Sequence, residues 1–519
     1  MLRWVNLWDN FIVDRVFDYS IITGESKPEK PCVINLKNND LAIDMLYKHI
    51  TGRESIAIHC DVDMDGVGSG YILKRFLETQ GAINRTGFTI NRDKEHGINE
   101  KHVKYTHNTP NLGLFIILDS SSNEVEHIKE MNCDVLVIDH HELNHRELSG
   151  DTAGGKYVIV NNTIDNNGYT ADKDMSCGLV TYELLRIYED IVGTDPVIDN
   201  IKLYQWAGIT LLSDVIPLNN PRNQWYIDNT LLKSDMEIGI KSILDKVNKY
   251  KAVLDKNTVL FNIVPLINAA IRTGNSAEAL DIVLNKPENI DELSKYRNMQ
   301  NEVINNEIGS LVHEDSYVLA TLDNEKFSNY TGLIASKLCG RFNKNCAVFI
   351  VEDGVAKGSF RGRLSGIDYR ESFESFGEGV YAQGHRAAFG FRANEELLDM
   401  IMSRLVEIET GYKINNYLTL GRVDTDYKGK YHIENMDEFK KMGLFWRMAI
   451  ANSRLSGEEI ITIITPNNNC KLVEKYNKAS IYDVDGVKCI GFEPLVTGWI
   501  ELYPEYGSDG VKVYIRNKY

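Results

Sequence analysis

The stretch "HCDVDMDG" carries one imidazole and three carboxylates at alternate positions, namely His59, Asp61, Asp63 and Asp65. Residues at alternate positions of an extended segment point to the same side, so this spacing would aim several of these side chains at one point. Carboxylates combined with imidazole suit Mn²⁺ or Mg²⁺ better than a structural zinc ion. The stretch therefore predicts a site for divalent cations.

The same acids also match the first half of an EF-hand calcium loop. Such a loop requires a bidentate Glu at its twelfth position, and the twelfth residue counted from Asp61 is Ile72. An EF-hand loop also follows a helix, whereas this stretch follows the short apolar run 56–58, which is typical of a buried strand. We favour a strand-loop-helix unit of a parallel sheet, which places ligands beyond the carboxyl end of its strands.

Three more apolar runs end on an acid or an imidazole. "GLFIILD" ends on Asp119, "CDVLVID" leads into Asp139, His140 and His141, and "ITLLSD" ends on Asp214. One such placement means little, because Asp often begins turns or caps helices. Four placements in one chain form a pattern, and they predict that distant segments complete one site.

We expect all four stretches to lie at strand ends, and in this order they resemble the motifs of the DHH phosphoesterases. In that family a binuclear Mn²⁺ or Mg²⁺ centre hydrolyses phosphoester or phosphoanhydride bonds. The spacing of His59, Asp63 and Asp65 also matches the first motif of many members. The resemblance implies two Mn²⁺ (or Mg²⁺) ions as cofactors.

Further stretches resemble the RecJ branch of this family, which also includes pyrophosphatases, nanoRNases and cyclic-dinucleotide phosphodiesterases. They are "FTINRDKEHGIN", "SDVIPLNNPRN" and "VPLINAAIRTG", followed by "KGSFRGR" and "YAQGHRAAFGF", which are similar to the associated DHHA1 domain. The resemblance spans roughly residues 50–395. It departs from RecJ at His59, where RecJ commonly has an apolar residue, and at Leu266, where RecJ has Arg.

The resemblance implies a role for each acid and imidazole. The implied metal ligands are His59, Asp63, Asp65, Asp119, His140 and Asp214. Asp119 would be shared by both ions, with His59 and Asp63 on one ion and the other three ligands on the second.

Three residues beside these ligands have other implied roles. His141 would lie by the substrate phosphate and bind it or protonate the leaving oxygen. Asp139 would orient an imidazole, and we count both residues as catalytic. Asp61 is either an outer acid or a solvated loop residue.

The phosphates of a substrate need cationic and amide partners. Guanidinium groups match phosphate oxygens, and glycines let a backbone approach closely. The candidate substrate-binding residues are Arg92, Arg272, Ser359, Arg361, Arg363, Gly384, His385 and Arg386. The alternative for residues 359–386 is a solvated turn, and the alternative for Arg92 and Arg272 is an ordinary surface arginine.

The composition is that of a globular protein, with 43% hydrophobic and 25% charged residues among 519. No apolar run has the length of a membrane span, and the N-terminus lacks the profile of a signal peptide. The eight cysteines form no CxxC pair, which argues against a zinc ribbon or a disulfide framework and favours a cytoplasmic location. The net charge of −17 predicts that any nucleic-acid groove is a local basic feature.

The pattern of apolar runs predicts an α/β protein. We expect a parallel-sheet DHH catalytic domain at residues 1–235, a helical connector at 236–325 and a smaller α/β DHHA1 substrate-binding domain at 326–412. Residues 413–519 are predicted to be β-rich. The label OB-like for that segment rests on its position and its strand content.

Together these features predict a RecJ-like phosphodiesterase that degrades single-stranded DNA from 5′ to 3′ and releases 5′-mononucleotides in DNA repair, recombination or replication. The polarity is implied by the resemblance alone. The alternative is a DHH phosphodiesterase of nano-oligonucleotides, including RNA, or of cyclic dinucleotides. A third class is an inactive nucleic-acid-binding scaffold, which would have no need to retain every ligand. Single-stranded DNA is the expected partner, together with a single-strand-binding, replication or repair protein, and no membrane is expected.

Overall fold

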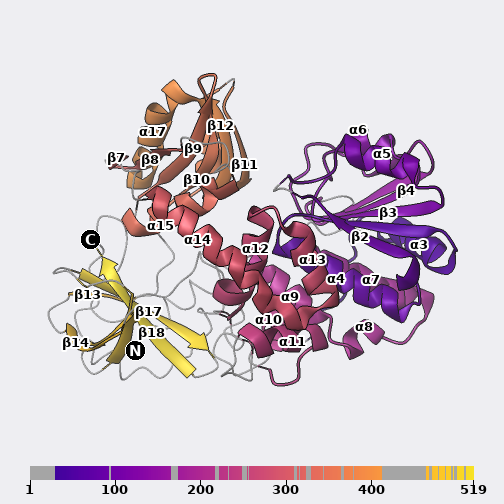
Figure 1. Ribbon diagram of the computed structural model, residues 1–519, viewed down its shortest axis with the longest axis horizontal. Coiled ribbons are helices and arrows are strands. Elements are labelled where there is room, and N and C mark those ends of the chain that lie inside the picture. The colour runs from indigo at the N-terminus through magenta and orange to yellow at the C-terminus, as the bar shows by residue number, and fades with distance from the viewer. Residues whose placement is uncertain are drawn as a thin grey trace, which may run out of the picture. The chain divides into compact units, whose positions relative to one another are not determined.

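The computed structural model describes residues 30–411 and 463–518, and these residues form two compact units (Figure 1). The first unit contains the described residues up to Arg297 together with those of Tyr506–Gly510, and the second contains the other described residues from Asn298 onward. None of the helices in these residues is both long and apolar enough to cross a lipid bilayer. The residues left out of the two ranges are 93–94, 165–173, 215, 217–220, 232, 248–253, 255, 257, 309–312, 315, 323–328, 343, 364–366, 378, 467–469, 477–478, 485–486, 493–494, 496–498 and 508–509.

The first unit contains a six-stranded sheet in the order β2-β1-β3-β4-β6-β5. All of its neighbouring strands pair in parallel except β5 with β6, so the predicted parallel sheet is confirmed. The strands are β1 (Ser55–Cys60), β2 (Thr86–Ile90), β3 (Leu112–Leu118), β4 (Asp134–Asp139), β5 (Ser149–Asp151) and β6 (Lys156–Asn161).

Helices cover both faces of this sheet, which is why its central strands are almost continuously apolar. Alternate residues such as Phe115 and Val137 pack with side chains of α5 (Glu100–Asn108) and α6 (Val125–Lys129). The opposite face is covered by α3 (Asn39–Thr51), α4 (Met64–Thr79) and α7 (Cys177–Val192). The core therefore lies on both sides of β1, β3 and β4.

The strand order fixes where a ligand should bind. The chain passes from β1 outward to β2 and then returns to the other side of β1 to form β3. The order thus reverses between β1 and β3, and open α/β sheets bind ligands at the carboxyl ends of the strands at such a point. Asp61 follows β1, and Asp119 follows β3.

A helical layer follows the sheet, formed by α9 (Tyr204–Ser213), α10 (Pro221–Thr230), α11 (Ile238–Val247), α12 (Val264–Arg272) and α13 (Ser276–Asn285). Helices α4, α7 and α9 pack closely because small residues lie between them. A Cβ atom at Gly68 would lie 2.6 Å from Cγ2 of Thr210, and one at Gly178 would lie 2.3 Å from its Oγ1. Asp214 is the C-cap of α9, so this acid follows a helix and not the strand end that we expected.

The second unit contains a mixed sheet in the order β11-β12-β10-β9-β8-β7. Its strands are β7 (His313–Glu314), β8 (Val318–Thr321), β9 (Cys346–Glu352), β10 (Val355–Arg361), β11 (Tyr381–His385) and β12 (Ala388–Asn394). Its helices are α15 (Thr331–Phe342), α16 (Tyr369–Glu374) and α17 (Leu398–Gly411).

The predicted helical connector, 236–325, is helical through α14 (Ser294–Ile308) but includes β7 and β8. The physical reason is that β8 pairs in parallel with β9 and buries Val318 in the sheet, a long-range contact that the local pattern does not reveal. The other predicted domain boundaries stay predictions.

A third sheet is formed near the C-terminus in the order β13-β17-β18-β16-β15-β14. Its strands are β13 (Ile463–Pro466), β14 (Cys470–Lys475), β15 (Ser480–Val484), β16 (Val487–Gly491), β17 (Trp499–Gly507) and β18 (Gly510–Lys518). The segment is β-rich over its described residues, and the OB-like label stays a prediction.

Candidate metal centre

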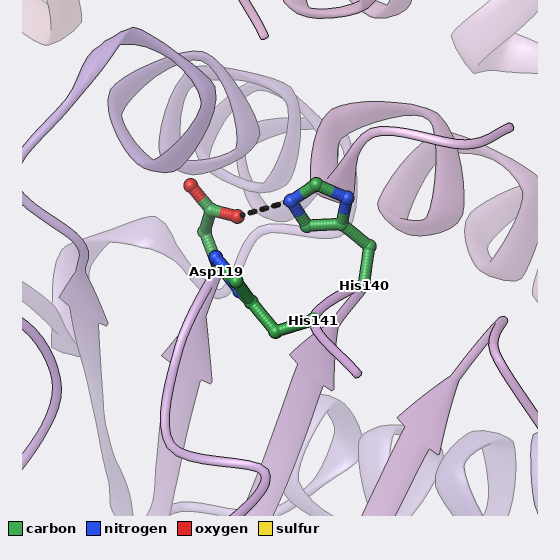
Figure 2. A group of neighbouring side chains, drawn as sticks. All are labelled: Asp119, His140 and His141. Carbon is green, nitrogen blue, oxygen red and sulfur yellow. Dashed lines mark ion pairs between the residues drawn. The ribbon is translucent and has the colours of Figure 1, made fainter. Parts of the chain in front are cut away.

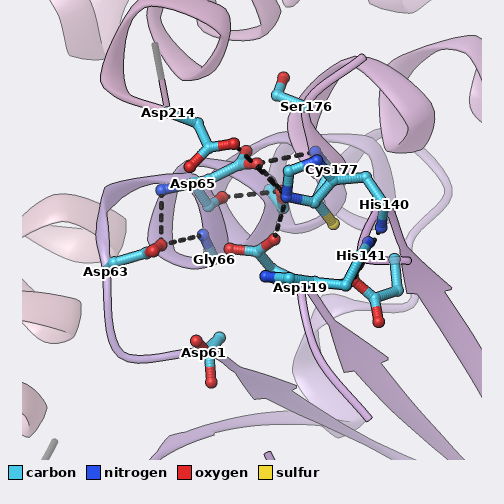
Figure 3. Close-up of polar contacts among 12 residues, drawn as sticks. Asp61, Asp63, Asp65, Gly66, Asp119, His140, His141, Ser176, Cys177 and Asp214 are labelled. Carbon is cyan, nitrogen blue, oxygen red and sulfur yellow. Dashed lines mark hydrogen bonds and ion pairs between the residues drawn. The ribbon is translucent and has the colours of Figure 1, made fainter. Parts of the chain in front are cut away.

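Two of the acids lie at the start of α4. Asp63 is the N-cap of this helix, and its Oδ1 accepts hydrogen bonds from the backbone N–H groups of Asp65 and Gly66 at 2.9 and 3.1 Å. The carboxylate of Asp65 accepts from the N–H groups of Cys177 and Gly178 at 2.7 and 2.9 Å. These donors are the first residues of α7, whose helix dipole favours an anion at this end (Figure 3).

Asp119 lies in the turn directly after β3 and is 1% exposed. Its backbone has φ 67°, a left-handed conformation that Asp adopts more readily than most residues. Its N–H donates to the carbonyl of Ile138 in β4 at 2.9 Å, which anchors the turn to the neighbouring strand. This conformation turns the carboxylate toward α4 and His140 (Figure 3).

His140 faces three carboxylates with one ring nitrogen. Its Nδ1 lies 2.9 Å from the carbonyl oxygen of Met175, and a carbonyl can only accept, so Nδ1 carries the proton. Nε2 lies 3.2 Å from Oδ1 of Asp119, 3.5 Å from Oδ2 of Asp214 and 3.8 Å from Oδ2 of Asp65 (Figures 2 and 3). The ring is thus oriented as a metal-binding imidazole is, with one nitrogen fixed by a hydrogen bond and the other aimed at the site.

The described residues contain three groups whose ligand atoms lie within 4.8 Å of one another. They are Asp61, Asp63 and Asp119; Asp65, His140 and Asp214; and Asp119, His140 and His141. Asp119 and His140 each belong to two groups. The groups therefore overlap, as two neighbouring cation positions would.

The charges of this cluster fit divalent cations. Burial raises the pKa of Asp65 well above its usual range, and the carboxylates of Asp214 and Asp63 raise it further. Burial likewise raises the pKa of Asp119, followed by the effects of Asp65 and Asp63. Oδ1 of Asp119 is buried without a hydrogen-bond partner in the described part of the chain. Crowded acids of this kind need positive charge, and oxygen ligands with one imidazole suit Mn²⁺ or Mg²⁺.

Asp139 holds the histidine pair in place. Its Oδ1 accepts from the N–H groups of His140 and His141 at 2.7 and 3.2 Å and lies 2.8 Å from Nδ1 of His141, and its Oδ2 accepts from the N–H of Ser122. Burial alone would raise the pKa of Asp139, but His141 and His140 hold it well below its usual range. Burial would lower the pKa of His141, whereas Asp139 raises it above its usual range. The His141 side chain is 54% exposed, so solvent weakens this attraction while the ring stays accessible.

His59 lies outside all three groups, although we expected it to be a ligand. It is the fifth residue of β1 and is fully buried, with Nδ1 3.2 Å from Oγ1 of Thr89 and its ring 4.3 Å from that of His102. Burial lowers the pKa of His59 to about 4, and His102 adds to this effect. Asp61, which is 1% exposed, forms a group with Asp63 and Asp119, where we had expected His59. The ligand role of His59 stays a prediction.

Of the predicted substrate-binding residues, two belong to the first unit. Arg92 is exposed after β2, and its carbonyl accepts from the Oγ–H of Ser276. Arg272 is half-buried at the end of α12.

The other predicted substrate-binding residues belong to the second unit. Ser359 and Arg361 are alternate residues of β10, which places both side chains on one face. Oγ of Ser359 lies 2.9 Å from Oγ1 of Thr331, the first residue of α15, and Arg361 Nε donates to Oγ of Ser336 on the same helix at 3.1 Å. The strand and the helix terminus thus bring hydroxyl and guanidinium groups together.

Of the remaining residues of that set, Arg363 follows β10, whereas Gly384, His385 and Arg386 lie at the end of β11 and in the turn that leads to β12. Gly384 has φ 133°, and a Cβ atom there would lie 2.9 Å from the carbonyl oxygen of Ala388, so this position requires glycine. The N–H of Arg363 donates to Asn345 at 2.8 Å, and Arg386 is exposed with its Nε 3.7 Å from Asp368. His385 ends β11, and its side chain lies outside the described residues.

Sequence reasoning missed His96 at this site, whose Nδ1 lies 2.6 Å from Oδ2 of Asp61. It also missed the backbone donors of Cys177 and Gly178. The available signals were the "HG" dipeptide after the second strand and the "SCG" start of the helix, both of which are too short to be specific.

Three comparisons place this chain among known proteins. Residues 55–208 match the model of the DHH family, N-terminal domain. The putative SPbeta prophage-derived single-strand DNA-specific exonuclease YorK of Bacillus subtilis (strain 168) is 23% identical over 422 residues, which cover 72% of this chain and 69% of that protein. The single-stranded-DNA-specific exonuclease RecJ of Escherichia coli (strain K12) is 23% identical over 430 residues, which cover 75% of this chain and 72% of that protein.

A solved structure shares the fold. The crystal structure of RecJ in complex with Mn²⁺ from Thermus thermophilus matches with a TM-score of 0.70 at 17% identity. The match covers 99% of this chain and 78% of that chain. The architecture is therefore RecJ-like.

Proposed function

We propose, from the match of residues 55–208 to the DHH family model, that this chain is an exonuclease of the DHH family that hydrolyses single-stranded DNA with two Mn²⁺ or Mg²⁺ ions. The proposed direction is 5′ to 3′, with release of 5′-mononucleotides, in DNA repair, recombination or replication. The observation that carries the proposal is the overlap of the acid and imidazole groups at Asp119 and His140.

The ligand set proposed for the two ions follows these groups. Asp61, Asp63 and Asp119 would hold one ion, and Asp65, His140 and Asp214 would hold the other, with Asp119 shared. Two divalent cations in one site supply an activated water and neutralise the oxygens of a phosphodiester. This assignment keeps our sequence-based pairing except that Asp61 replaces His59.

His141 is proposed to contact the scissile phosphate or its leaving oxygen. Its Nδ1 is bound by Asp139, and more than half of the side chain is exposed, so the ring stays oriented while remaining accessible. Asp139 is proposed to orient the ring without binding a cation, because it belongs to none of the three groups of possible ligand atoms and its Oδ1 faces Nδ1 of His141. A positioned imidazole of this kind contributes about 10²–10⁴-fold to a proton-transfer step.

Single-stranded DNA is proposed as the substrate because both curated relatives are named for that substrate. The phosphate backbone would be bound by Arg361, Ser359 and the glycine turn at Gly384, which combine guanidinium, hydroxyl and exposed backbone groups.

The test is degradation of 5′-phosphorylated single-stranded DNA by the full chain with Mn²⁺, using strands labelled at either end. A 5′ label should appear at once as a mononucleotide, while a 3′ label should persist on shortening strands, and a blunt duplex should be spared. Mononucleotides released first from the 3′ label would contradict the direction. Cleavage confined to two- to five-residue oligonucleotides or cyclic dinucleotides would contradict the proposed substrate.

A further inference from the structure

His96 contacts an acid of the metal centre from a segment that carries none of the predicted ligands. Its Nδ1 lies 2.6 Å from Oδ2 of Asp61, and the N–H of Gly97 donates to Oδ1 of the same carboxylate at 3.1 Å. Asp61 is 1% exposed, whereas the His96 side chain is 55% exposed. Both oxygens of a buried acid are thus bound by two consecutive residues.

The surrounding loop is built to hold this contact. The buried side chain of Asn91 donates to the carbonyls of Glu95 and Gly97, both at 2.7 Å, and so clamps the backbone on either side of His96. Oγ of Ser121, two residues after Asp119, accepts from the N–H of Ile98 at 3.0 Å. These hydrogen bonds tie the loop to the ends of β2 and β3.

Gly97 is required for this close approach. It has φ 72°, and a Cβ atom at this position would lie 2.9 Å from Oγ of Ser121. The loop therefore reaches Asp61 only because residue 97 has no side chain.

Asp61 needs such partners because of its neighbours. One of its oxygens lies within 4.8 Å of ligand atoms of Asp63 and Asp119, which are also carboxylates. Like charges at this range repel, and an unconstrained side chain would turn away from them. A hydrogen bond to each oxygen fixes the plane of the carboxylate and leaves further lone pairs on both oxygens.

We propose that His96 is a positioning residue of the metal centre, which holds the Asp61 carboxylate toward Asp63 and Asp119 by donating a hydrogen bond from Nδ1. This inference rests on the proposed metal centre. Partners of metal ligands typically change metal affinity by about 10–100-fold when they are removed. Nδ1 is the atom that matters, because it is the atom facing Asp61.

The test compares His96→Asn, His96→Gln and His96→Ala in the full chain, with Mn²⁺ affinity measured by calorimetry without substrate. The amide nitrogen of Asn overlaps Nδ1 of His, while that of Gln overlaps Nε2. Asn should therefore retain an affinity close to that of the wild type, whereas Gln and Ala should weaken Mn²⁺ binding about 10–100-fold. His107→Asn is the matched control, because His107 is an exposed histidine on α5 that bonds the carbonyl of Glu130.

Thermal unfolding in EDTA separates positioning from folding. The His96 variants should remain folded in EDTA and lose no more than about 1–3 kcal/mol of stability, the cost of removing one partner from a buried carboxylate. Unchanged Mn²⁺ affinity in His96→Ala would overturn the inference, as would equal affinities of His96→Asn and His96→Gln. A wild-type chain that binds no Mn²⁺ would instead overturn the proposed centre, and the inference with it.

Discussion

Oδ1 of Asp119 lies 3.2 Å from Nε2 of His140, although the two residues follow different strands of the sheet. Because Nδ1 of His140 is bonded to the Met175 carbonyl, Nε2 presents a lone pair to the carboxylate. Two acceptor atoms at this distance repel each other unless a cation lies between them. A cation between Asp119 and His140 would relieve this repulsion. Substitution of Asp119 is therefore the most direct test of the proposed metal centre.

Asp119→Asn should remove most of the Mn²⁺-dependent activity and most of the stabilisation of the fold by Mn²⁺. Asn tolerates the left-handed backbone of residue 119, so the variant removes charge without adding the strain that Ala would bring. Activity should fall by more than about 100-fold, because even the partners of metal ligands are worth about 10–100-fold. Wild-type protein at about 100 times its Kd for Mn²⁺ should gain about 2.7 kcal/mol of stability, and the variant should gain much less.

In EDTA the same variant should be more stable than the wild type. The folded state raises the pKa of Asp119, so its ionised form destabilises the fold at neutral pH, and replacing it with a neutral amide removes that cost. Chemical denaturation at pH 7, with Mn²⁺ and with EDTA, measures the free energy of unfolding that both predictions concern. A variant that keeps the full Mn²⁺-dependent stabilisation would exclude Asp119 from the centre.

Arg361→Ala should weaken binding of single-stranded DNA in a salt-dependent manner. A single-strand phosphate contact contributes about 0.7 to the slope of log K against log salt, so the slope should fall by about that amount. Fluorescence anisotropy between 50 and 300 mM salt would measure it. Arg404→Ala is the control, because Arg404 is an exposed arginine of α17 paired with Glu407. An unchanged slope would remove Arg361 from the phosphate contacts.

Asp134, which is not part of the candidate metal centre, should make the free energy of unfolding depend on pH. Its carboxylate is bonded by Lys48, His49 and the N–H of Lys156 at 2.7 to 2.8 Å. Burial opposes ionisation, but His49 and Lys48 outweigh it and hold the pKa of Asp134 below its usual range. Its stabilising contribution should therefore be complete above about pH 4, the usual Asp value, and should be lost as the pH falls through the lower folded value.

The measurement is the free energy of unfolding in EDTA for Asp134→Asn and the wild type from pH 7 to pH 3. The variant should be less stable by about 1–3 kcal/mol at pH 7, and the difference should shrink below about pH 4. Glu100→Gln, which removes an exposed partner of Lys104, should change little at any pH. A difference that stays constant down to pH 3 would contradict the role of the ionised carboxylate.

Much of the clustering of acids and imidazoles could be predicted because parallel strands end at one edge of a sheet. Apolar runs ending on Asp119 and Asp139 are visible in the sequence, and the topology brings them together. The sequence also suggested Asp214, but for the wrong reason, since α9 and not a strand carries it. A fully buried helix and a buried strand have similar apolar runs, so periodicity alone does not separate them.

That Asp61, and not His59, groups with Asp63 and Asp119 in the folded chain was beyond the local pattern. Alternate spacing aims side chains together only while the chain stays extended, and here β1 ends at Cys60 and α4 begins at Met64. His59 therefore faces the interior beside His102, whereas Asp61 lies in the turn. The partner that holds Asp61 is 35 residues away, and only the folded chain brings the two together.

Thr210 packs against Gly68 and Gly178, and neither glycine could carry a Cβ atom without a shift of the helices. This packing would influence which ion the proposed centre binds. Asp65 lies on α4 and is bound by the start of α7, while Asp214 ends α9, so the gap between these two acids depends on how closely the three helices pack. A methyl group at either glycine would push α9 outward and widen that gap. A wider gap suits an ion of larger radius, because Mg²⁺ requires oxygens at about 2.1 Å and Ca²⁺ accepts about 2.4 Å. Ionic radius would then be selected by two glycines that are not themselves candidate ligands.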